Sequence, residues 1–386
     1  MRFGRRPPAA GPRIGVVMPV HDVEAYLPQA LDSVLAQHGV ELDVVVVDDG
    51  STDRSGAIAD AYAARDPRVR VVHTENYGLG AARNEGLRHV RGDLLGFADS
   101  DDVVPPGSYA LMAAALERGS ADLVTGSMAR WDGSPRPVEG GGLTELRWMR
   151  RLHRERRTCT VEDHPEILGD VFAPNKLFRR DFWERLRLSW PEGVRYEDQP
   201  TTTRAFVGAT RFTVLPEVVY HWRVRADGSS ITQQRSSVQD LRDRWTTKRM
   251  SLATVEAHGS RSVYETFVDR VLAGDLHRYF VEIPGCPDEW WDLLAGGVQE
   301  LWAERSLVHS GLTPVHRLTG WLVEQGRRTD AAAVMEYAAA LGRPLPQLSD
   351  AAGARLDVPD HVLDAATVDP AALALRAFEV RVRPGG

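Results

Sequence analysis

Two acidic clusters in the N-terminal third of the chain combine residue types and positions that can do chemistry. Asp48 and Asp49 follow four consecutive valines, and Asp99 and Asp101 follow the apolar run 94–98. Such runs are typical of buried parallel strands, and ligands of open α/β sheets bind beyond the carboxyl ends of those strands. Carboxylates at neighbouring strand ends repel one another unless a cation or hydrogen-bond donors offset their charge. The clusters therefore predict one crevice for a divalent metal and a phosphorylated ligand.

The segments around these clusters alternate between strand and helix patterns. Strands are expected over 14–18, 43–47, 69–73, 93–98 and 122–125. Helices are expected over 23–37, 53–65, 79–90 and 106–118. Strands separated by helices of this length predict βαβ units, and hence a doubly wound, mostly parallel sheet with helices on both faces.

Changes of pattern divide the chain into domains. We expect a flexible tail, an α/β domain made of two halves, a helical domain and a short strand-like C-terminal segment. Their bounds are 1–13, 14–237 (halves 14–130 and 131–237), 238–345 and 346–386. The three glycines at 140–142 indicate a flexible joint, and further strands are expected over 172–178 and 218–224.

Composition is typical of a globular protein kept in a reducing compartment. The 386 residues are 43% hydrophobic and 26% charged, and the two cysteines suggest neither a disulfide framework nor a metal knuckle. The N-terminus lacks the apolar stretch of a signal peptide, and no segment has the roughly 20 apolar residues of a membrane helix. We therefore expect a cytoplasmic protein.

Charge is unevenly distributed along the chain. The net charge is −7, yet residues 143–250 hold 21 Lys and Arg against 15 Asp and Glu. A basic middle between acidic flanks indicates an anionic partner there, although a solvated basic surface gives the same pattern. Nucleic acid is not expected, because the chain has no recognised nucleic-acid motif.

Four motifs in a fixed order identify a family. They are Val17–His21, Val47–Asp53, Asn76–Asn84 and Asp99–Asp102. Together they closely resemble the family 2 glycosyltransferases over roughly residues 13–235. The resemblance implies a GT-A fold, a nucleotide-sugar donor, Mn²⁺ or Mg²⁺ as cofactor, and inversion at the anomeric carbon.

The resemblance implies a set of donor-binding residues. Backbone atoms of 19–21 wrap the base and ribose, and Asp49 accepts the imide N–H of uracil, which cytosine lacks. Arg83 follows two glycines near a helix N-terminus, a place that suits phosphate, and Asp99 contacts ribose. The nucleotide-sugar set is Pro19, Val20, His21, Asp49, Arg83, Asp99, Ser100, Lys176, Arg223 and Ser230.

Metal and catalytic roles also follow from the resemblance. Asp101 is the direct metal ligand of a DxD motif, and carboxylate oxygens suit a hard divalent cation. His221 is a candidate to complete the metal shell or touch phosphate. Asp198 matches the base that takes the acceptor proton, and Glu197 supports the acceptor site.

The helical region after residue 238 resembles the wall-teichoic-acid sugar transferases of Gram-positive bacteria. That resemblance implies a UDP-sugar donor and a polysaccharide or polyol-phosphate acceptor, which the Arg-rich segment 147–157 would suit. The β modules of that subgroup are expected to be missing or incomplete. Peripheral membrane association at the inner face and homo-oligomerisation stay open.

Three other functions fit parts of the pattern. One is a capsular or exopolysaccharide transferase with a lipid-linked or neutral acceptor. Another is a GT-A nucleotidyltransferase, but the loop 19–22 lacks that class's Gly-rich basic run. The last is a binding module without catalysis, against which the presence of both Asp101 and Asp198 argues.

Overall fold

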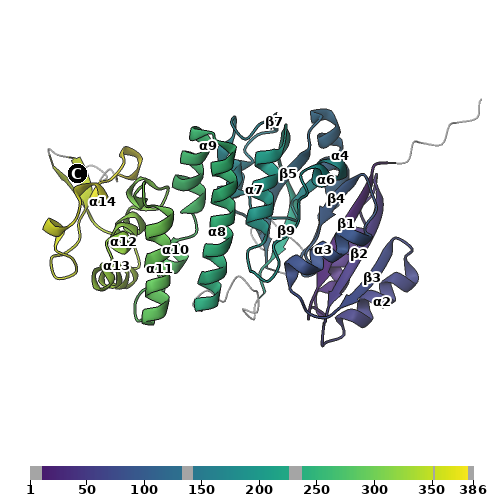
Figure 1. Cartoon of the computed structure of the whole chain (residues 1–386), viewed down its shortest axis with the longest axis horizontal. Coiled ribbons are helices and arrows are strands. Elements are labelled where there is room, and N and C mark those ends of the chain that lie inside the picture. The colour runs from purple at the N-terminus through teal and green to yellow at the C-terminus, as the bar shows by residue number, and fades with distance from the viewer. Residues whose placement is uncertain (1–10, 133–141, 226–236, 351–352, 381–386) are drawn as a thin grey trace, which may run out of the picture. The chain divides into compact units, whose positions relative to one another are not determined.

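The computed structural model describes residues 11–132, 142–225, 237–350 and 353–380. The chain forms two compact units (Figure 1). The N-terminal unit comprises residues 1–231 with 253–260, and the C-terminal unit comprises 232–252 with 261–386. Residues 1–10 of the predicted tail 1–13 and most of the glycine joint lie outside the described residues, and Arg13 already belongs to the first strand.

A mixed nine-stranded sheet forms the centre of the N-terminal unit. Strands β1 to β4 run parallel, β8 is antiparallel to both β4 and β5, and β9 is parallel to β5. In spatial order the strands are β3 (Val69–Thr74), β2 (Glu41–Asp49), β1 (Arg13–Val20), β4 (Leu94–Phe97), β8 (Lys176–Arg179), β5 (Leu123–Trp131), β9 (Phe212–Arg223) and β7 (Arg157–Cys159), with β6 (Leu143–Glu145) beside β5.

Helices cover both faces of this sheet, which explains why its central strands are apolar throughout. Val16 and Met18 of β1 share a core with α1 and α4, including Leu31 and Leu116. Val17 points to the other face, where a Cβ added to Gly86 of α3 would lie 2.3 Å from its side chain. The helices are α1 (Leu27–Leu35), α2 (Ser55–Arg65), α3 (Leu79–His89), α4 (Ser108–Gly119), α5 (Arg147–Leu152), α6 (Arg180–Arg185) and α7 (Asp198–Gly208), with a 3₁₀ turn at Pro165–Gly169.

Strand register brings the two acidic clusters to one edge of the sheet. β1 lies between β2 and β4, with Val20 opposite Asp48 and Val17 opposite Phe97. Because these strands are parallel, their carboxyl ends meet. Asp48 and Asp49 at the end of β2 and the loop after β4 therefore lie on either side of the end of β1.

Two segments differ from the sequence-based expectation. The strand expected over 172–178 begins only at Lys176, because residues 170–175 form a loop held by buried polar side chains. The helix expected over 23–37 is limited to Leu27–Leu35. Residues 23–26 instead form a turn that is tied to the 53–55 loop through backbone N–H groups.

The C-terminal unit is mainly helical. Its helices are α8 (Val238–His258, whose last turns group with the N-terminal unit), α9 (Arg261–Thr266), a π-helix (Phe267–Leu272), α10 (His277–Phe280), α11 (Asp288–Leu301), α12 (Pro314–Glu324), α13 (Arg328–Leu341) and α14 (Pro370–Leu373), with 3₁₀ turns at Leu307–His309, Ala365–Thr367 and Ala377–Glu379. Large buried side chains such as Trp245 and Trp290 fill its core. Among the described residues, no helix combines the length and the apolar character needed to cross a membrane.

The strand-like reading of residues 346–386 is correct only for its first part. β10 (Gln347–Asp350) and β11 (Gly353–Leu356) form a hairpin, but the alternating residues 378–380 do not continue it. Glu379 instead accepts hydrogen bonds from the buried guanidinium of Arg317 at 2.6 and 2.8 Å, within a 3₁₀ turn. A buried ion pair therefore sets the local backbone there. Residues 381–386 lie outside the described part.

Candidate active site

Arg83, in the second turn of α3, binds three carboxylates that come from two distant motifs. Its side chain is 1% exposed and donates to Glu197 Oε1 at 2.6 Å, to Asp99 Oδ1 at 2.9 Å and to Asp198. Burial lowers the pKa of this guanidinium, but the charges of the three acids outweigh burial and hold it well above its ordinary value. In this structure Arg83 thus organises acids, and its expected nucleotide contact stays a prediction.

Trp190 and Gly80 support the buried arginine. The guanidinium carbon of Arg83 lies 4.9 Å from the centroid of the Trp190 ring, a cation–π contact. Asn84 fixes Trp190 by accepting its N–H at 2.9 Å and donating to its carbonyl at 2.8 Å. A Cβ on Gly80 would lie 2.0 Å from the Pro191 carbonyl oxygen. This glycine therefore allows α3 to pack against the 190–193 turn.

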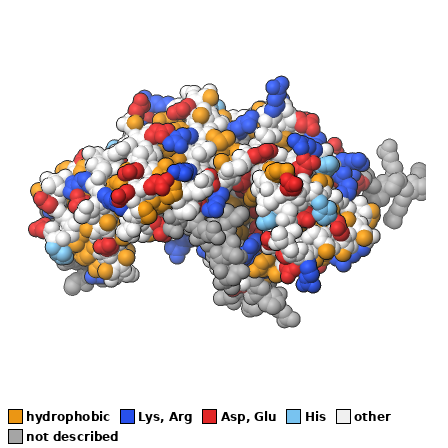
Figure 2. Space-filling model, turned by 60° about the horizontal axis from the view of Figure 1, so that its bottom comes forward, with side chains coloured by type: hydrophobic (Ala, Val, Ile, Leu, Met, Phe, Trp, Pro, Cys, Tyr) orange, Lys and Arg blue, Asp and Glu red, His pale blue; other side chains and the backbone are white. Residues whose placement is uncertain are grey.

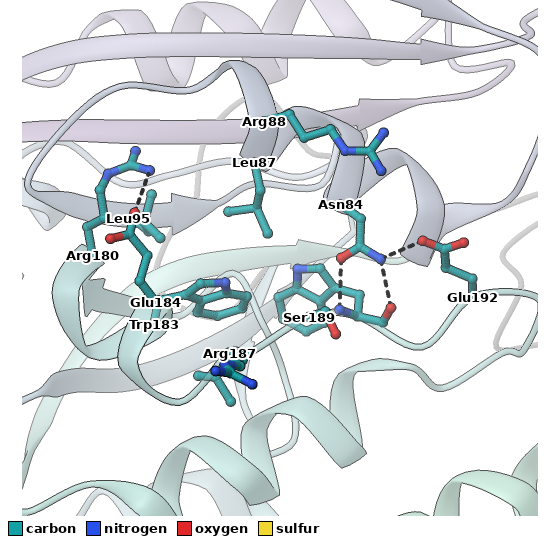
Figure 3. Close-up of a pocket in the computed structure, with 12 residues that line it drawn as sticks. Asn84, Leu87, Arg88, Leu95, Arg180, Trp183, Glu184, Arg187, Ser189 and Glu192 are labelled. Carbon is teal, nitrogen blue, oxygen red and sulfur yellow. Dashed lines mark hydrogen bonds and ion pairs between the residues drawn. The ribbon is translucent and has the colours of Figure 1, made fainter.

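A pocket of about 620 Å³ lies next to this support (Figure 3). Asn84, Trp183 and Trp190 line it, and Figure 3 shows Asn84 bonded to the neighbouring backbone and to Glu192. None of the predicted donor, metal or catalytic residues lines this pocket. The acidic cluster around Arg83 must therefore be considered separately from it.

Asp198 is the first residue of α7, and two donors orient its carboxylate. Arg83 donates to Oδ1, and the backbone N–H of Ala173 donates to Oδ2 at 3.2 Å. The side chain is 21% exposed, so a substrate hydroxyl can reach it from solvent. A carboxylate that is fixed yet accessible has the geometry required of a general base.

A network of buried polar side chains holds the loop that carries Ala173. Asp170 pairs with Lys176 at 2.9 Å and accepts hydrogen bonds from Thr125 and His153. Lys176 also donates to the Phe172 carbonyl at 2.7 Å, and burial lowers the pKa of its ammonium. These contacts show that Lys176 orders the loop, and a contact with the donor stays a prediction.

The DxD segment is held by two arginines at the end of β9. Arg225 donates to Asp101 Oδ2 through two nitrogens at 2.7 and 2.8 Å, and Arg223 donates to the Asp101 carbonyl at 2.6 Å. Asp102 accepts the Arg223 N–H at 2.7 Å. Burial, reinforced by neighbouring acids, raises the pKa of Asp102 well above its ordinary value. These contacts leave Asp99 and Asp101 as the partly exposed acids, at 30% and 20%.

The donor set at this segment fits a divalent cation bound mainly through substrate. In the described part of the chain, no three His, Cys, Asp or Glu side chains gather as a metal-binding group. Mg²⁺ is commonly held by one or two carboxylates and completes its shell with phosphate oxygens and water. Asp101, with Asp99 beside it, can supply that small protein share.

Comparison with models of protein families identifies the part of the chain that contains Arg83 and the DxD segment. Residues 15–186 match the model described as glycosyl transferase family 2. These residues form a family 2 glycosyltransferase domain. The resemblance predicted from the four motifs is thereby confirmed, and the domain includes Arg83, Asp99 and Asp101 but ends before Asp198.

Two relatives with similar sequences come from bacteria. The chain is 32% identical over 213 residues to the uncharacterized glycosyltransferase EpsJ of Bacillus subtilis, covering 55% of this chain and 61% of EpsJ. It is 26% identical over 272 residues to the poly(ribitol-phosphate) beta-N-acetylglucosaminyltransferase TarS of Staphylococcus aureus, covering 69% of this chain and 44% of TarS. The matching part thus spans less than two thirds of either relative.

A solved structure resembles the chain over most of its length. The crystal structure of residues 1–349 of S. aureus TarS in complex with UDP-GlcNAc matches with a TM-score of 0.66 and 20% identity. The match covers 89% of this chain and 96% of that structure. Similarity at this identity concerns the fold, and it confirms the predicted GT-A class followed by a helical region.

The end of the family 2 domain that is expected to recognise the base is tightly hydrogen-bonded. Asp49 accepts the backbone N–H groups of Tyr77 at 2.9 Å and Gly78 at 2.8 Å. His21 donates from Nδ1 to the Asp49 carbonyl at 2.9 Å. Pro19 and Val20 end β1, and Val20 is buried in the core, which leaves mainly backbone for a ligand. A uracil contact of Asp49 stays a prediction.

The remaining predicted site residues fall into three situations. Ser100 is buried beside Asp99, and Ser230 lies outside the described residues. The imidazole of His221 makes no hydrogen bond or ion pair with the described part of the chain, and burial lowers its pKa. The adjacent Tyr220 hydroxyl is the group that reaches the acidic site, where it accepts the N–H of Asp99 at 3.0 Å. A metal role for His221 therefore gains no support.

Glu197 gives the site a measurable pH dependence. Burial and the charge of Asp198 raise its pKa to about 8, despite the opposing charge of Arg83. Because the folded state binds this proton more tightly than the unfolded state, the stability that it contributes is lost as pH rises through about 8. In thermal unfolding without ligands, Glu197→Gln should therefore gain in midpoint relative to wild type between pH 5 and pH 8. If the difference in unfolding midpoint between Glu197→Gln and wild type stays constant from pH 5 to pH 8, the raised pKa of Glu197 is wrong.

Proposed function

We propose that this chain transfers a sugar from a UDP-sugar to a hydroxyl of an anionic cell-envelope polymer, with Asp198 as the base. The observation that carries the proposal is the bridging of Asp99 and Asp198 by one guanidinium, that of Arg83. Because one guanidinium contacts both the expected donor-binding acid and the expected base, the bridge supports a single active site that contains the two acids. The fold shared with TarS, which has been crystallised with UDP-GlcNAc, supports a UDP-sugar as donor.

The reaction is a single displacement. The acceptor hydroxyl approaches Asp198, which takes its proton as the oxygen attacks the anomeric carbon. The bond from that carbon to the diphosphate oxygen breaks on the opposite side, and its electron pair leaves with UDP. An α-linked donor sugar then gives a β-linked product. Glu197 and Asp99, tied to the same arginine, keep the base in position.

Charge at the leaving group is offset from the β9 side. Arg223 and Arg225 lie beside Asp101, and their positive charge stabilises the anion that forms as UDP departs. A bound Mg²⁺ or Mn²⁺ on Asp101 would supply Lewis-acid stabilisation of the diphosphate. In that case the guanidinium of Arg225 is also well placed to bind phosphate oxygens.

The acceptor class can be tested in one assay with two acceptors. The name of TarS specifies poly(ribitol-phosphate), and residues 143–250 of this chain have a net positive charge. We expect transfer to poly(ribitol phosphate) to exceed transfer to an uncharged capsular glycan at least tenfold in kcat/KM. We also expect the difference to shrink as salt rises. Glycosylation of the neutral acceptor alone would refute the polyanion and favour a capsular or exopolysaccharide transferase.

A further inference from the structure

Three aromatic side chains from separate segments form a ladder in the N-terminal unit. Trp148 of α5 stacks on Phe172 of the 170–175 loop, with ring centroids 6.0 Å apart and planes 21° apart. Phe172 in turn lies 6.0 Å from Trp222 at the end of β9. Phe172 and Trp222 pack partly against the main core, whereas Trp148 is 40% exposed. Neither the fold nor the proposed chemistry requires an exposed indole here.

Both inner members of the ladder are adjacent in sequence to residues of the active site. Ala173, which follows Phe172, donates its N–H to Asp198. Arg223, which follows Trp222, donates to the carbonyl of Asp101. The two inner rings therefore belong to segments that contact the expected base and the DxD segment. Trp148 is the exposed end of the ladder.

Cations accompany the aromatic rings. The guanidinium carbon of Arg130 lies 5.5 Å from the centroid of the Trp222 ring. Four exposed arginines lie in α5 or just after it and pair with no described residue: Arg147, Arg150, Arg151 and Arg154. On the face in Figure 2, by contrast, acidic and basic side chains are intermingled. Four unpaired arginines on the segment that carries the exposed ring of Trp148 therefore favour an anionic partner.

We propose that this ladder and the α5 arginines bind the acceptor polymer as a chain of polyol and phosphate units. The carbon-bound hydrogens of a sugar or polyol are weakly positive and pack against the negative face of an aromatic ring. Guanidinium groups bind phosphate through paired hydrogen bonds. The alternation of such units along the polymer matches rings and arginines presented together. This inference rests on the proposed function, because it extends the acceptor side of the same site.

The test measures transfer to poly(ribitol phosphate) and, separately, UDP release from the donor to water without acceptor. Trp148→Ala should raise the acceptor KM roughly tenfold, which equals about 1.4 kcal/mol, with kcat and acceptor-free UDP release unchanged. Trp148→Phe should restore most of the affinity. Phe378→Ala, which truncates another exposed aromatic, serves as the matched control. The double variant Arg150→Gln/Arg151→Gln should raise the same KM and weaken its dependence on salt.

The outcomes separate the two proposals. An unchanged acceptor KM in Trp148→Ala would overturn the ladder while leaving the proposed function intact. If Trp148→Ala lowers transfer and acceptor-free UDP release equally, Trp148 has a structural role, and the proposal that the ladder binds the acceptor is also overturned. A further outcome is that Trp148→Ala raises the KM for a neutral glycan while Arg150→Gln/Arg151→Gln leaves the acceptor KM unchanged. That result would overturn the assignment of a polyol-phosphate acceptor to the ladder. Wild-type protein that releases no UDP from any UDP-sugar would instead refute the proposed function.

Discussion

Replacing Arg83 with methionine is expected to destabilise the N-terminal unit and to abolish sugar transfer. The change keeps an apolar side chain against Trp190 but leaves Asp99, Glu197 and Asp198 facing one another without their cation. Removing one partner of a buried ion pair typically costs about 3–5 kcal/mol, because the remaining charge is uncompensated. Urea unfolding followed by tryptophan fluorescence should show a loss of this size at pH 7.5.

Two further variants test whether repulsion among the three acids causes the loss of stability in Arg83→Met. Arg185→Met, which breaks an exposed pair with Asp122, should cost less than about 1 kcal/mol. Adding Glu197→Gln to Arg83→Met removes one of the three crowded acids and should recover part of the lost stability. The recovery should grow as pH rises from 7.5 to 9, because the raised pKa of Glu197 keeps much of this acid protonated at pH 7.5. The deficit of Arg83→Met should also narrow at pH 5, where the crowded acids take up protons. A deficit independent of pH and of Glu197→Gln would mean that packing, rather than charge, holds the site together.

The fold was predictable because local patterns and tertiary packing agree. The valines before Asp48 and the apolar residues before Asp99 indicate buried parallel strands, and both segments are parallel strands of one sheet. A strand that is covered by helices on both faces has apolar residues at consecutive positions. An uninterrupted apolar run therefore predicts a sheet with helices on both sides. Strand ends were less predictable: β5 continues to Trp131 because it pairs with β6 and β9, which follow later in the chain.

The roles of charged residues were harder to predict, because partners distant in sequence decide them. Arg83 has the local features of a phosphate ligand, but Glu197 and Asp198, more than 110 residues away, occupy its guanidinium. For Lys176 a signal was available, since it precedes the apolar residues 177–178 at a strand start and is therefore in a buried setting. Trp190 was missed because nothing in the Trp-Pro-Glu-Gly turn indicates contact with Arg83.

Replacing Asp198 with asparagine is expected to leave a folded protein that no longer transfers sugar. Asparagine keeps the size of the side chain, and its amide oxygen can still accept from Arg83. It loses the hydrogen bond from the N–H of Ala173, because an NH2 group replaces Oδ2, and it cannot take a proton at neutral pH. A positioned general base typically contributes about 10²–10⁴-fold to rate. Asp163→Asn changes an acid in the 160–163 turn that accepts from Thr160, away from the acidic cluster, and should retain wild-type activity.

The most direct measurement compares wild type, Asp198→Asn and Asp163→Asn in transfer from UDP-GlcNAc to poly(ribitol phosphate) with Mn²⁺. Binding of UDP is measured in parallel by calorimetry. The account predicts a kcat at least about 10²-fold lower in Asp198→Asn alone, UDP affinity within a factor of three of wild type, and a β-linked product from wild type. Transfer by Asp198→Asn at the wild-type rate, or an α-linked product, would contradict a single displacement driven by Asp198.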